Sequence, residues 1–157
     1  MATKKFKLTD DTIVIDGITL HRIKALRSFG NVTKGNLGGW VEKEENLSQL
    51  GDAWIDENAK VYGNAYIFEN ALISGEAMIY GHSRITDDVY IHGNANIYGY
   101  SIIHGTANVY GDSKIHGVSN VCGNANIHGN AEISDGARCS GNAEIYGDAK
   151  VCHICNK

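Results

Sequence analysis

Small and aliphatic side chains recur at a fixed interval of six residues through residues 51–152. This stretch divides into seventeen consecutive hexapeptides without an insertion, and residues 63–68, Gly-Asn-Ala-Tyr-Ile-Phe, form a typical unit. The third residue of each unit is Ala or Ser except at Val89, and the fifth is Ile or Val except at Cys139. A six-residue period of this length predicts a β-solenoid.

The spacing indicates which side chains point inward. Positions three and five are two residues apart, so on a strand they share one face, while positions four and six share the other. Position one is usually Gly and position two often Asn, which tolerate the left-handed backbone that a sharp corner needs. Three sides make a coil of eighteen residues, so we expect about six triangular coils, stacked to roughly 27 Å. Asn recurs at position two, as at Asn64, Asn70, Asn94, Asn124, Asn130 and Asn142.

Side chains eighteen residues apart should stack in outward-facing columns, while Ile and Ala leave no room for a ligand inside. Two columns are aromatic: Tyr62, Tyr80, Tyr98 and His116 form one, and His92, Tyr110, His128 and Tyr146 form the other. Other outward positions hold Trp54, Leu72, Tyr90, Tyr66, Phe68 and Ile102. Such columns either stiffen adjacent coils or form a contact between subunits, and both interpretations remain open.

Residues 1–50 do not follow the repeat. Residues 12–15 and 18–23 are predicted to form a β-hairpin around Asp16-Gly17, a favoured two-residue turn. Trp40-Val41 is expected to be a short strand. Residues 24–29 are compatible with either a strand or a short helical turn. The sequence therefore predicts an all-β chain with two parts: a β-rich cap over residues 1–50, and a parallel β-helix over residues 51–157.

Composition and charge narrow the classes of partner. The net charge is −4, but residues 1–50 contain eight Lys or Arg against six acids, and the rest contains six against twelve. An acidic prism disfavours binding of extended nucleic acid. No apolar run is long enough to span a membrane, and the sequence shows no signal peptide. The four Cys lie late in the chain and suit reduced thiols, so we expect a cytoplasmic protein.

The repeat also places an aliphatic residue four positions before a small one, as in Ile67 with Ala71 and Ile73 with Ala77. This pattern resembles the hexapeptide-repeat, left-handed β-helix superfamily over about two-thirds of the chain. Residues 20–54 are similar to small hexapeptide-repeat proteins of phages and bacteria, often labelled transferases without a demonstrated activity. The resemblance implies a left-handed helix behind a small N-terminal module and, by analogy with the superfamily, assembly as a trimer; it does not imply a reaction.

Histidines are the first candidates for chemistry, because acyltransferases of that superfamily use a His as general base between subunits. His92, His104, His116 and His128 are twelve residues apart, so successive ones fall on different faces. We interpret them as surface ladder residues. An acyltransferase would also be expected to interrupt its coils with a long loop and to close its C-terminal end, and the sequence shows neither feature.

The basic cap is the second candidate. Arg22, Lys24, Arg27 and Lys34 accompany the Gly-rich residues 34–39 and Trp40. Cationic side chains and glycine N–H groups can bind an anion, and an indole can stack on a base. The alternative is that Trp40 closes the cap core and the charges form a solvated face.

Cys152 and Cys155, in Cys-His-Ile-Cys, supply only part of a zinc site, so we expect no metal and no cofactor. The sequence as a whole favours a non-catalytic binding protein, phage-encoded and forming a homo-oligomer, most simply a trimer. It would sequester a small anionic or nucleotide ligand, or a host protein, through its cap. The alternative is an acyltransferase with a His at a subunit interface.

Overall fold

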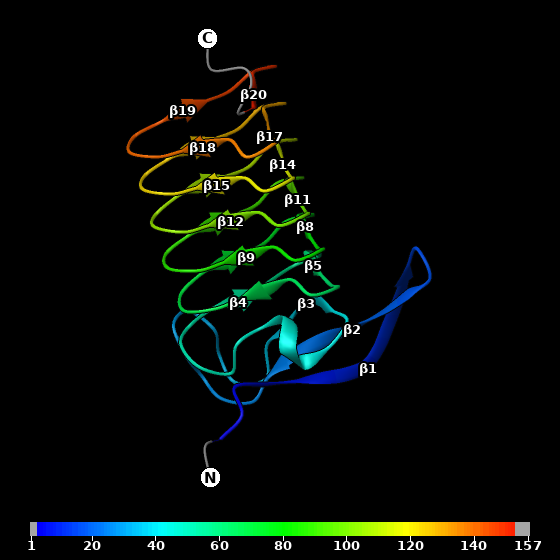
Figure 1. Ribbon diagram of the computed structural model, residues 1–157. Helices are drawn as coiled ribbons and strands as arrows, with labels where there is room; N and C mark the ends of the chain where they lie inside the picture. Colours follow the sequence, from blue (N-terminus) through cyan, green and yellow to red (C-terminus); the bar gives the residue numbers. More distant parts are fainter. Residues whose placement is uncertain (1–2, 153–157) are drawn as a thin grey trace.

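The protein is a stack of triangular coils with an N-terminal hairpin at one end, as the computed structural model shows for residues 3–152 (Figure 1). The elements before the coils are β1 (Phe6–Ile15), β2 (Ile18–Ala25), β3 (Leu37–Val41) and a short 3-10 helix, η1 (Glu44–Asn46). The prediction of an all-β parallel solenoid of about six coils is confirmed. Its handedness stays a prediction.

The coils present three parallel sheets, here called faces 1, 2 and 3. Face 1 contains β5 (Lys60–Val61), β8 (Met78–Ile79), β11 (Asn96–Ile97), β14 (Lys114–Ile115), β17 (Glu132–Ser134) and β20 (Lys150–Cys152). Face 2 contains β6 (Tyr66–Ile67), β9 (Arg84–Ile85), β12 (Ile102–Ile103), β15 (Asn120–Val121) and β18 (Arg138–Cys139). Face 3 contains β4 (Trp54–Ile55), β7 (Leu72–Ile73), β10 (Tyr90–Ile91), β13 (Asn108–Val109), β16 (Asn126–Ile127) and β19 (Glu144–Ile145).

Neighbouring strands on a face pair residues eighteen apart, as in Ile73 with Ile91. The aliphatic residues at position five are therefore stacked in the interior, and Ile73, Ile91 and Ile97 are completely buried. This in-register stacking keeps every unit's inward and outward positions aligned from coil to coil.

The corners confirm the role predicted for position one. The residue there has a positive φ in every unit, and it is Gly except at Glu57, Glu69, Asp87 and Asp135. A carboxylate at this position can reach the next coil, since Asp87 Oδ2 accepts the N–H of Gly105 at 2.7 Å. Most corners thus take Gly, for its conformational freedom, and at Glu57 and Asp87 the corner is an acid whose carboxylate accepts the backbone N–H of the next coil.

The hairpin forms as predicted but is longer than the sequence indicated. Asp16 and Gly17 both have positive φ, at 49° and 81°, as a tight two-residue turn requires. β3 pairs antiparallel with β2 and parallel with β5, so it joins the hairpin to face 1. The solenoid pairing thus begins at β3, ahead of residue 51.

The N-terminal module, residues 3–50, supplies hydrogen-bond donors to the first coil. In the coils, an N–H donates to the carbonyl seventeen residues later, as from Tyr62 to Ile79 at 3.0 Å, so first-coil carbonyls lack a coil beneath them. Lys5 Nζ donates to the carbonyls of Ala53 at 2.7 Å and Gly51 at 3.3 Å. Asn46 Nδ2 donates to those of Gly63 and Ala65, and the amides of Trp40, Glu42 and Ser48 donate to those of Ala59, Val61 and Ile67.

Lys5 is a buried charge at this junction. Its side chain is fully enclosed, and its ammonium lies 5.0 Å from the centre of the Phe29 ring. Burial, with a smaller contribution from the Arg27 charge, lowers the pKa of Lys5 to about 8, while Asp52 opposes that shift. The module thus satisfies backbone carbonyls at the expense of desolvating an ammonium.

Two aromatic residues predicted to face solvent are buried, which corrects the sequence interpretation. Trp54 is 3 % exposed, because the loop between β2 and β3 folds over face 3 and places Phe29 against it, with ring centres 5.4 Å apart. Tyr62 is 6 % exposed, at the end of face 1 where the module joins it. Burial is also the main cause that raises the pKa of Tyr62 to about 12.

Candidate functional site

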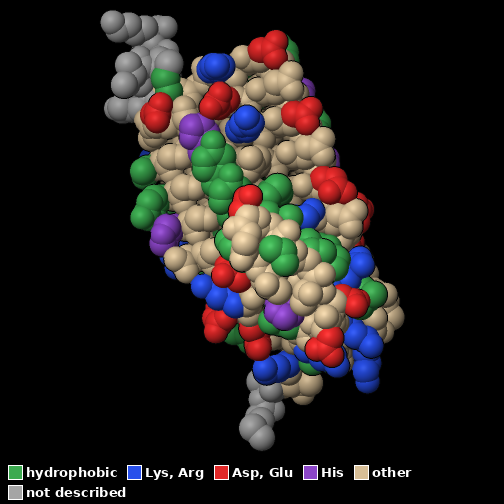
Figure 2. Space-filling model, turned by 90° about the vertical axis from the view of Figure 1, so that its right-hand side faces the viewer, with side chains coloured by type: hydrophobic (Ala, Val, Ile, Leu, Met, Phe, Trp, Pro, Cys, Tyr) green, Lys and Arg blue, Asp and Glu red, His purple; other side chains and the backbone are tan. Residues whose placement is uncertain are grey.

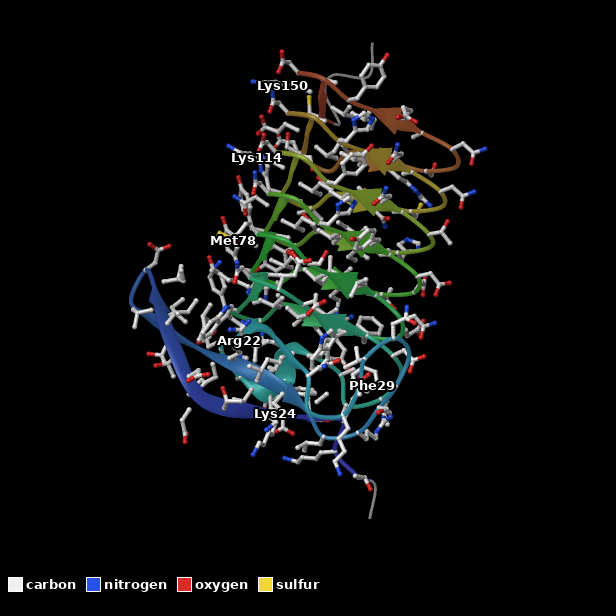
Figure 3. All side chains as sticks on the ribbon, turned by 180° about the vertical axis from the view of Figure 1, so that it is seen from behind. Arg22, Lys24, Phe29, Met78, Lys114 and Lys150 are labelled. Carbon is white, nitrogen blue, oxygen red and sulfur yellow. The ribbon has the colours of Figure 1, made fainter. Side chains whose placement is uncertain are left out.

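Arg22 and Trp40 come together on neighbouring strands of the module. They are cross-strand partners in β2 and β3, and the Arg22 guanidinium lies 5.3 Å from the centre of the Trp40 ring. Arg22 Nε donates to the carbonyl of Gly38 at 3.0 Å. Lys24 follows on β2, with Lys7 as its partner on β1, and lies below Arg22 in Figure 3. These contacts hold one cation over a half-buried indole.

The other two predicted cations lie elsewhere on the module. Arg27 is placed over Phe29, at 5.5 Å from the ring centre, on the loop between β2 and β3. Lys34 is on an exposed turn of the same loop, where its backbone N–H donates to Ser28 Oγ. Figure 3 shows Phe29 well away from Arg22. The five sequence-predicted residues therefore form two groups rather than one cluster.

Lys34 and Gly35 form an exposed turn, but Gly38 and Gly39 are not part of the flexible anion-binding turn that the sequence suggested. Gly38 and Gly39 lie within β3 and are buried against the first coil. A Cβ on Gly38 would lie 2.5 Å from the carbonyl of Ile55, and one on Gly39 would lie 2.5 Å from that of Ala59. These glycines allow close backbone packing, so their backbone does not form a mobile phosphate-binding loop.

The four histidines singled out from the sequence all bind a side chain of the next coil. Each lies at position six and reaches the position-four residue sixteen places later. The pairs are His92 with Asn108 (3.1 Å), His104 with Asn120 (3.2 Å), His116 with Glu132 (2.7 Å) and His128 with Glu144 (2.8 Å). The hydrogen bond from His116 is the main cause that lowers the pKa of Glu132. These imidazoles are therefore tied into the walls of the prism.

The predicted aromatic columns are stacked with nearly parallel rings. On face 1, Tyr80 and Tyr98 have centres 5.1 Å apart and an interplanar angle of 7°. On face 3, Tyr110 and His128 have centres 4.9 Å apart and an angle of 5°. Stacking between coils is thus confirmed as one role of these residues.

The three edges of the prism differ strongly in chemistry. Position two forms a polar ladder on the edge between faces 3 and 1, where Asn94 Nδ2 donates to Asp112 Oδ1 at 2.9 Å. The edge between faces 2 and 3 is also polar, with Asn70 donating to Asp88 at 3.1 Å. The third edge, between faces 1 and 2, contains Asn64, His82, Tyr100, Val118 and Gly136 at position two. We call this third edge the apolar edge.

His82 is the residue that sequence reasoning missed. Its ring stacks on that of Tyr100 with centres 4.6 Å apart. Within residues 3–152, it is the one histidine whose ring nitrogens make no hydrogen bond. A comparison of position two across the three edges could have identified it, because Asn, Asp, Glu and Thr occupy that position on the other two.

Two adjoining shallow hollows lie where the module meets face 2. Their volumes are about 300 and 250 Å³, and Ser48 and Tyr66 line both. The larger one also contains Glu44 and Glu45, and the smaller one Glu69. A shared hydrogen bond with Asp87 is the main cause that raises the pKa of Glu69. The acidic lining of these hollows does not suit the anionic ligand that the sequence predicted.

The described cysteines and acids do not suggest a metal centre. Cys139 is buried in its inward position, as predicted, and burial raises the pKa of its thiol. Cys155 and His153 of the terminal Cys-His-Ile-Cys lie outside the described residues. Across residues 3–152, no group of three or more His, Cys, Asp or Glu is arranged to hold a metal ion.

Comparison with known proteins found no match to the chain: no model of a known family matches it, and no curated protein matches it either. The resemblance to the hexapeptide-repeat superfamily therefore stays a prediction. In the part of the chain that the structure describes, no helix is long and apolar enough to cross a membrane.

Proposed function

We propose that this protein is a non-catalytic binding protein that acts as a homo-oligomer and captures its ligand through the N-terminal module. The walls of the prism support a structural role for the coils, because their interior is filled and four of their histidines are bound to neighbouring coils. Binding of a small anion or nucleotide, or of a host protein, is then the task of the module.

The Arg22–Trp40 pair is the observation that carries this proposal. A guanidinium has five N–H donors, and the structure gives an acceptor within residues 3–152 to the one on Nε. The terminal NH₂ groups of Arg22 therefore retain donors for a phosphate or carboxylate, while stacking on Trp40 limits the freedom of the side chain. Lys24 adds a second cation two residues along β2. Arg27 and Lys34, on the loop between β2 and β3, would contact the more distant parts of the same anionic ligand.

The test begins with mass spectrometry of small molecules that co-purify with the protein. Affinity for the recovered compound, or for a nucleoside diphosphate as probe, is then compared between the parent and Arg22→Ala. Loss of one charge-assisted contact should weaken binding by about tenfold to a hundredfold. Arg84→Ala, an exposed arginine on face 2, is the matched control and should bind like the parent. Equal affinities for Arg22→Ala and the parent would contradict the proposal.

A second candidate function is acyl transfer, and His82 is the observation that favours it. Within residues 3–152 this imidazole has no hydrogen-bond partner, and it lies on an edge that a second subunit could reach, as a general base at a subunit interface requires. The uninterrupted coils favour the binding protein. Recovery of coenzyme A or an acyl derivative, together with turnover that disappears in His82→Asn, would favour the enzyme instead.

A further inference from the structure

The apolar edge lacks the intramolecular hydrogen-bonded ladder found on the other two edges. On those edges, position-two side chains bind across coils: Asn94 donates to Asp112 on one edge, and Asn70 donates to Asp88 on the other. Tyr100 and Val118 occupy the same position but make no hydrogen bond through their side chains within residues 3–152, and they are 59 % and 68 % exposed. Most of their apolar surface is therefore exposed to solvent, although the ring of His82 covers one face of the Tyr100 ring.

Neighbouring residues extend this apolar surface onto both adjoining faces. Ile102, at position four of face 2, is 40 % exposed, and Tyr98 lies at position six of face 1. Figure 2 looks onto face 1: hydrophobic and His side chains follow one long edge of the prism, whereas acidic side chains follow the opposite one. A contiguous apolar strip of this kind marks an interaction surface.

From this contrast we propose that the apolar edge, centred on Tyr100 and Val118, is the surface on which a second copy of this chain docks. This inference rests on the proposed function, in which the protein acts as a homo-oligomer, and it identifies the surface through which the subunits contact each other. It leaves the ligand site on the module, so the two can be tested separately.

The repeat spacing indicates that the occupant is another copy. His82 and Tyr100 form a ridge whose rings are 4.6 Å apart, and Val118 continues it in the next coil. A row of side chains at this interval interdigitates best with a second row of the same interval, as in paired β-sheets. The prism of a second copy has rows of side chains with the same spacing, so the two rows can interdigitate over several coils.

Electrostatic repulsion favours this edge over the other two as the contact between copies. The polar edges carry acids at position two, among them Glu76, Asp112 and Asp148 in alternate coils on one edge and Asp88 on the other. Two copies that met along those edges would place like charges together, on a chain whose net charge is already −4. Positions one and two of the apolar edge contain no acid from residue 63 to residue 118. Docking along it therefore avoids the repulsion.

The experiment measures molar mass by light scattering at micromolar concentration for the parent and for the double variant Tyr100→Asn, Val118→Asn. Asn is the residue that the repeat uses at position two on the other edges, so the corner geometry should be preserved. The parent should have two or three times the 17.0 kDa mass of one chain. The double variant should have the mass of one chain, with a dissociation constant raised by about a hundredfold or more.

The chain offers a matched control in Tyr146→Asn. Tyr146 is 61 % exposed and stacks on His128, much as Tyr100 stacks on His82, but it lies on face 3. This control should keep the mass of the parent. Circular dichroism and thermal melting verify that each variant is folded, and Tyr100→Phe, which keeps the apolar contact, should stay oligomeric even if the double variant unfolds. A parent of 17.0 kDa, or dissociation equally caused by Tyr146→Asn or Tyr100→Phe, would overturn the proposal.

Anion affinity separates this inference from the proposed function. A double variant that has the mass of one chain and still binds the probe through Arg22 supports the edge contact and leaves the module as the ligand site. A parent that is oligomeric through Tyr100 and Val118 but indifferent to Arg22→Ala supports the edge contact and removes the ligand site.

Discussion

Replacement of Lys5 by Met tests how the N-terminal module is joined to the first coil. Met retains the aliphatic packing of the lysine but leaves the carbonyls of Gly51 and Ala53 without the donor seen at 3.3 and 2.7 Å. Hydrogen bonds from a charged donor contribute about 1.5–3 kcal/mol each. Met also removes the cost of burying the ammonium. That cost is about 3 kcal/mol, because burial lowers the pKa of Lys5 from 10.5 to about 8. The net loss expected near pH 7.5 is about 2 kcal/mol, or a fall in Tm of about 4–8 °C.

The dependence on pH identifies the lysine as the cause. The folded protein releases the Lys5 proton near pH 8, and the unfolded chain keeps it up to the ordinary value of 10.5. Between these values the unfolded state binds more protons, so Lys5 makes the parent more stable as pH rises. The stability difference between parent and Lys5→Met should therefore grow by about 2 kcal/mol from pH 7.5 to pH 9.5. Groups common to both proteins cancel in this difference.

Chemical denaturation at the two pH values measures this effect, and Lys4→Met provides the control. Lys4 is exposed and forms a surface ion pair with Glu44 at 3.0 Å, a contact that contributes little to stability. Lys4→Met should change the free energy of unfolding by less than about 0.5 kcal/mol at either pH. If the loss in Lys5→Met were the same at both pH values, or no larger than that in Lys4→Met, the assigned role of the ammonium would be refuted.

Three further substitutions test the coils, each by denaturation followed by circular dichroism. Ile97→Asp buries a carboxylate in the middle of the stack and should abolish folding; a native spectrum would contradict the assignment of the core. Gly93 has a φ of 65°, so both Gly93→Asp and Gly93→Ala should destabilise the protein. Gly93→Asp should be the more stable variant by about 1 kcal/mol, because its carboxylate can accept the backbone N–H of the next coil, as at Asp87. A more stable Gly93→Ala would refute this role of acids at the corner. The depressed pKa of Glu132 contributes stability that is lost as pH falls below about 4.5, so His116→Phe, which keeps the stack, should shift the acid transition upward; an unshifted transition would remove this role.

The coils could be predicted from the sequence because each of their positions is repeated many times. Ala or Ser at position three and Ile at position five indicate a strand, an inward face and a corner without any distant information. The histidine pairs follow the same geometry, since position six of one coil lies beside position four of the next. His116 with Glu132 and His128 with Glu144 could therefore have been identified from a separation of sixteen residues.

The N-terminal module could be predicted only in part, because its packing depends on contacts that no repeat encodes. Asp16-Gly17 identified the hairpin, but nothing local showed that the β2–β3 loop would bury Trp54 or that Lys5 would lie beneath the first coil. Gly38 and Gly39 were interpreted as a flexible turn because glycine runs are common in turns. Their actual role depends on the carbonyls of Ile55 and Ala59, which lie far along the chain.

The ladder on the edge between faces 3 and 1 limits how such a protein can change its length. Along that edge Asn and acid alternate strictly: Asn58, Glu76, Asn94, Asp112, Asn130 and Asp148. Removal of one hexapeptide would move every later column onto a different face. Removal of a whole coil of eighteen residues would restore the faces but would place two acids, or two asparagines, about 4.8 Å apart. Only insertions and deletions in steps of two coils, thirty-six residues at a time, therefore keep the alternation of Asn and acid along this edge.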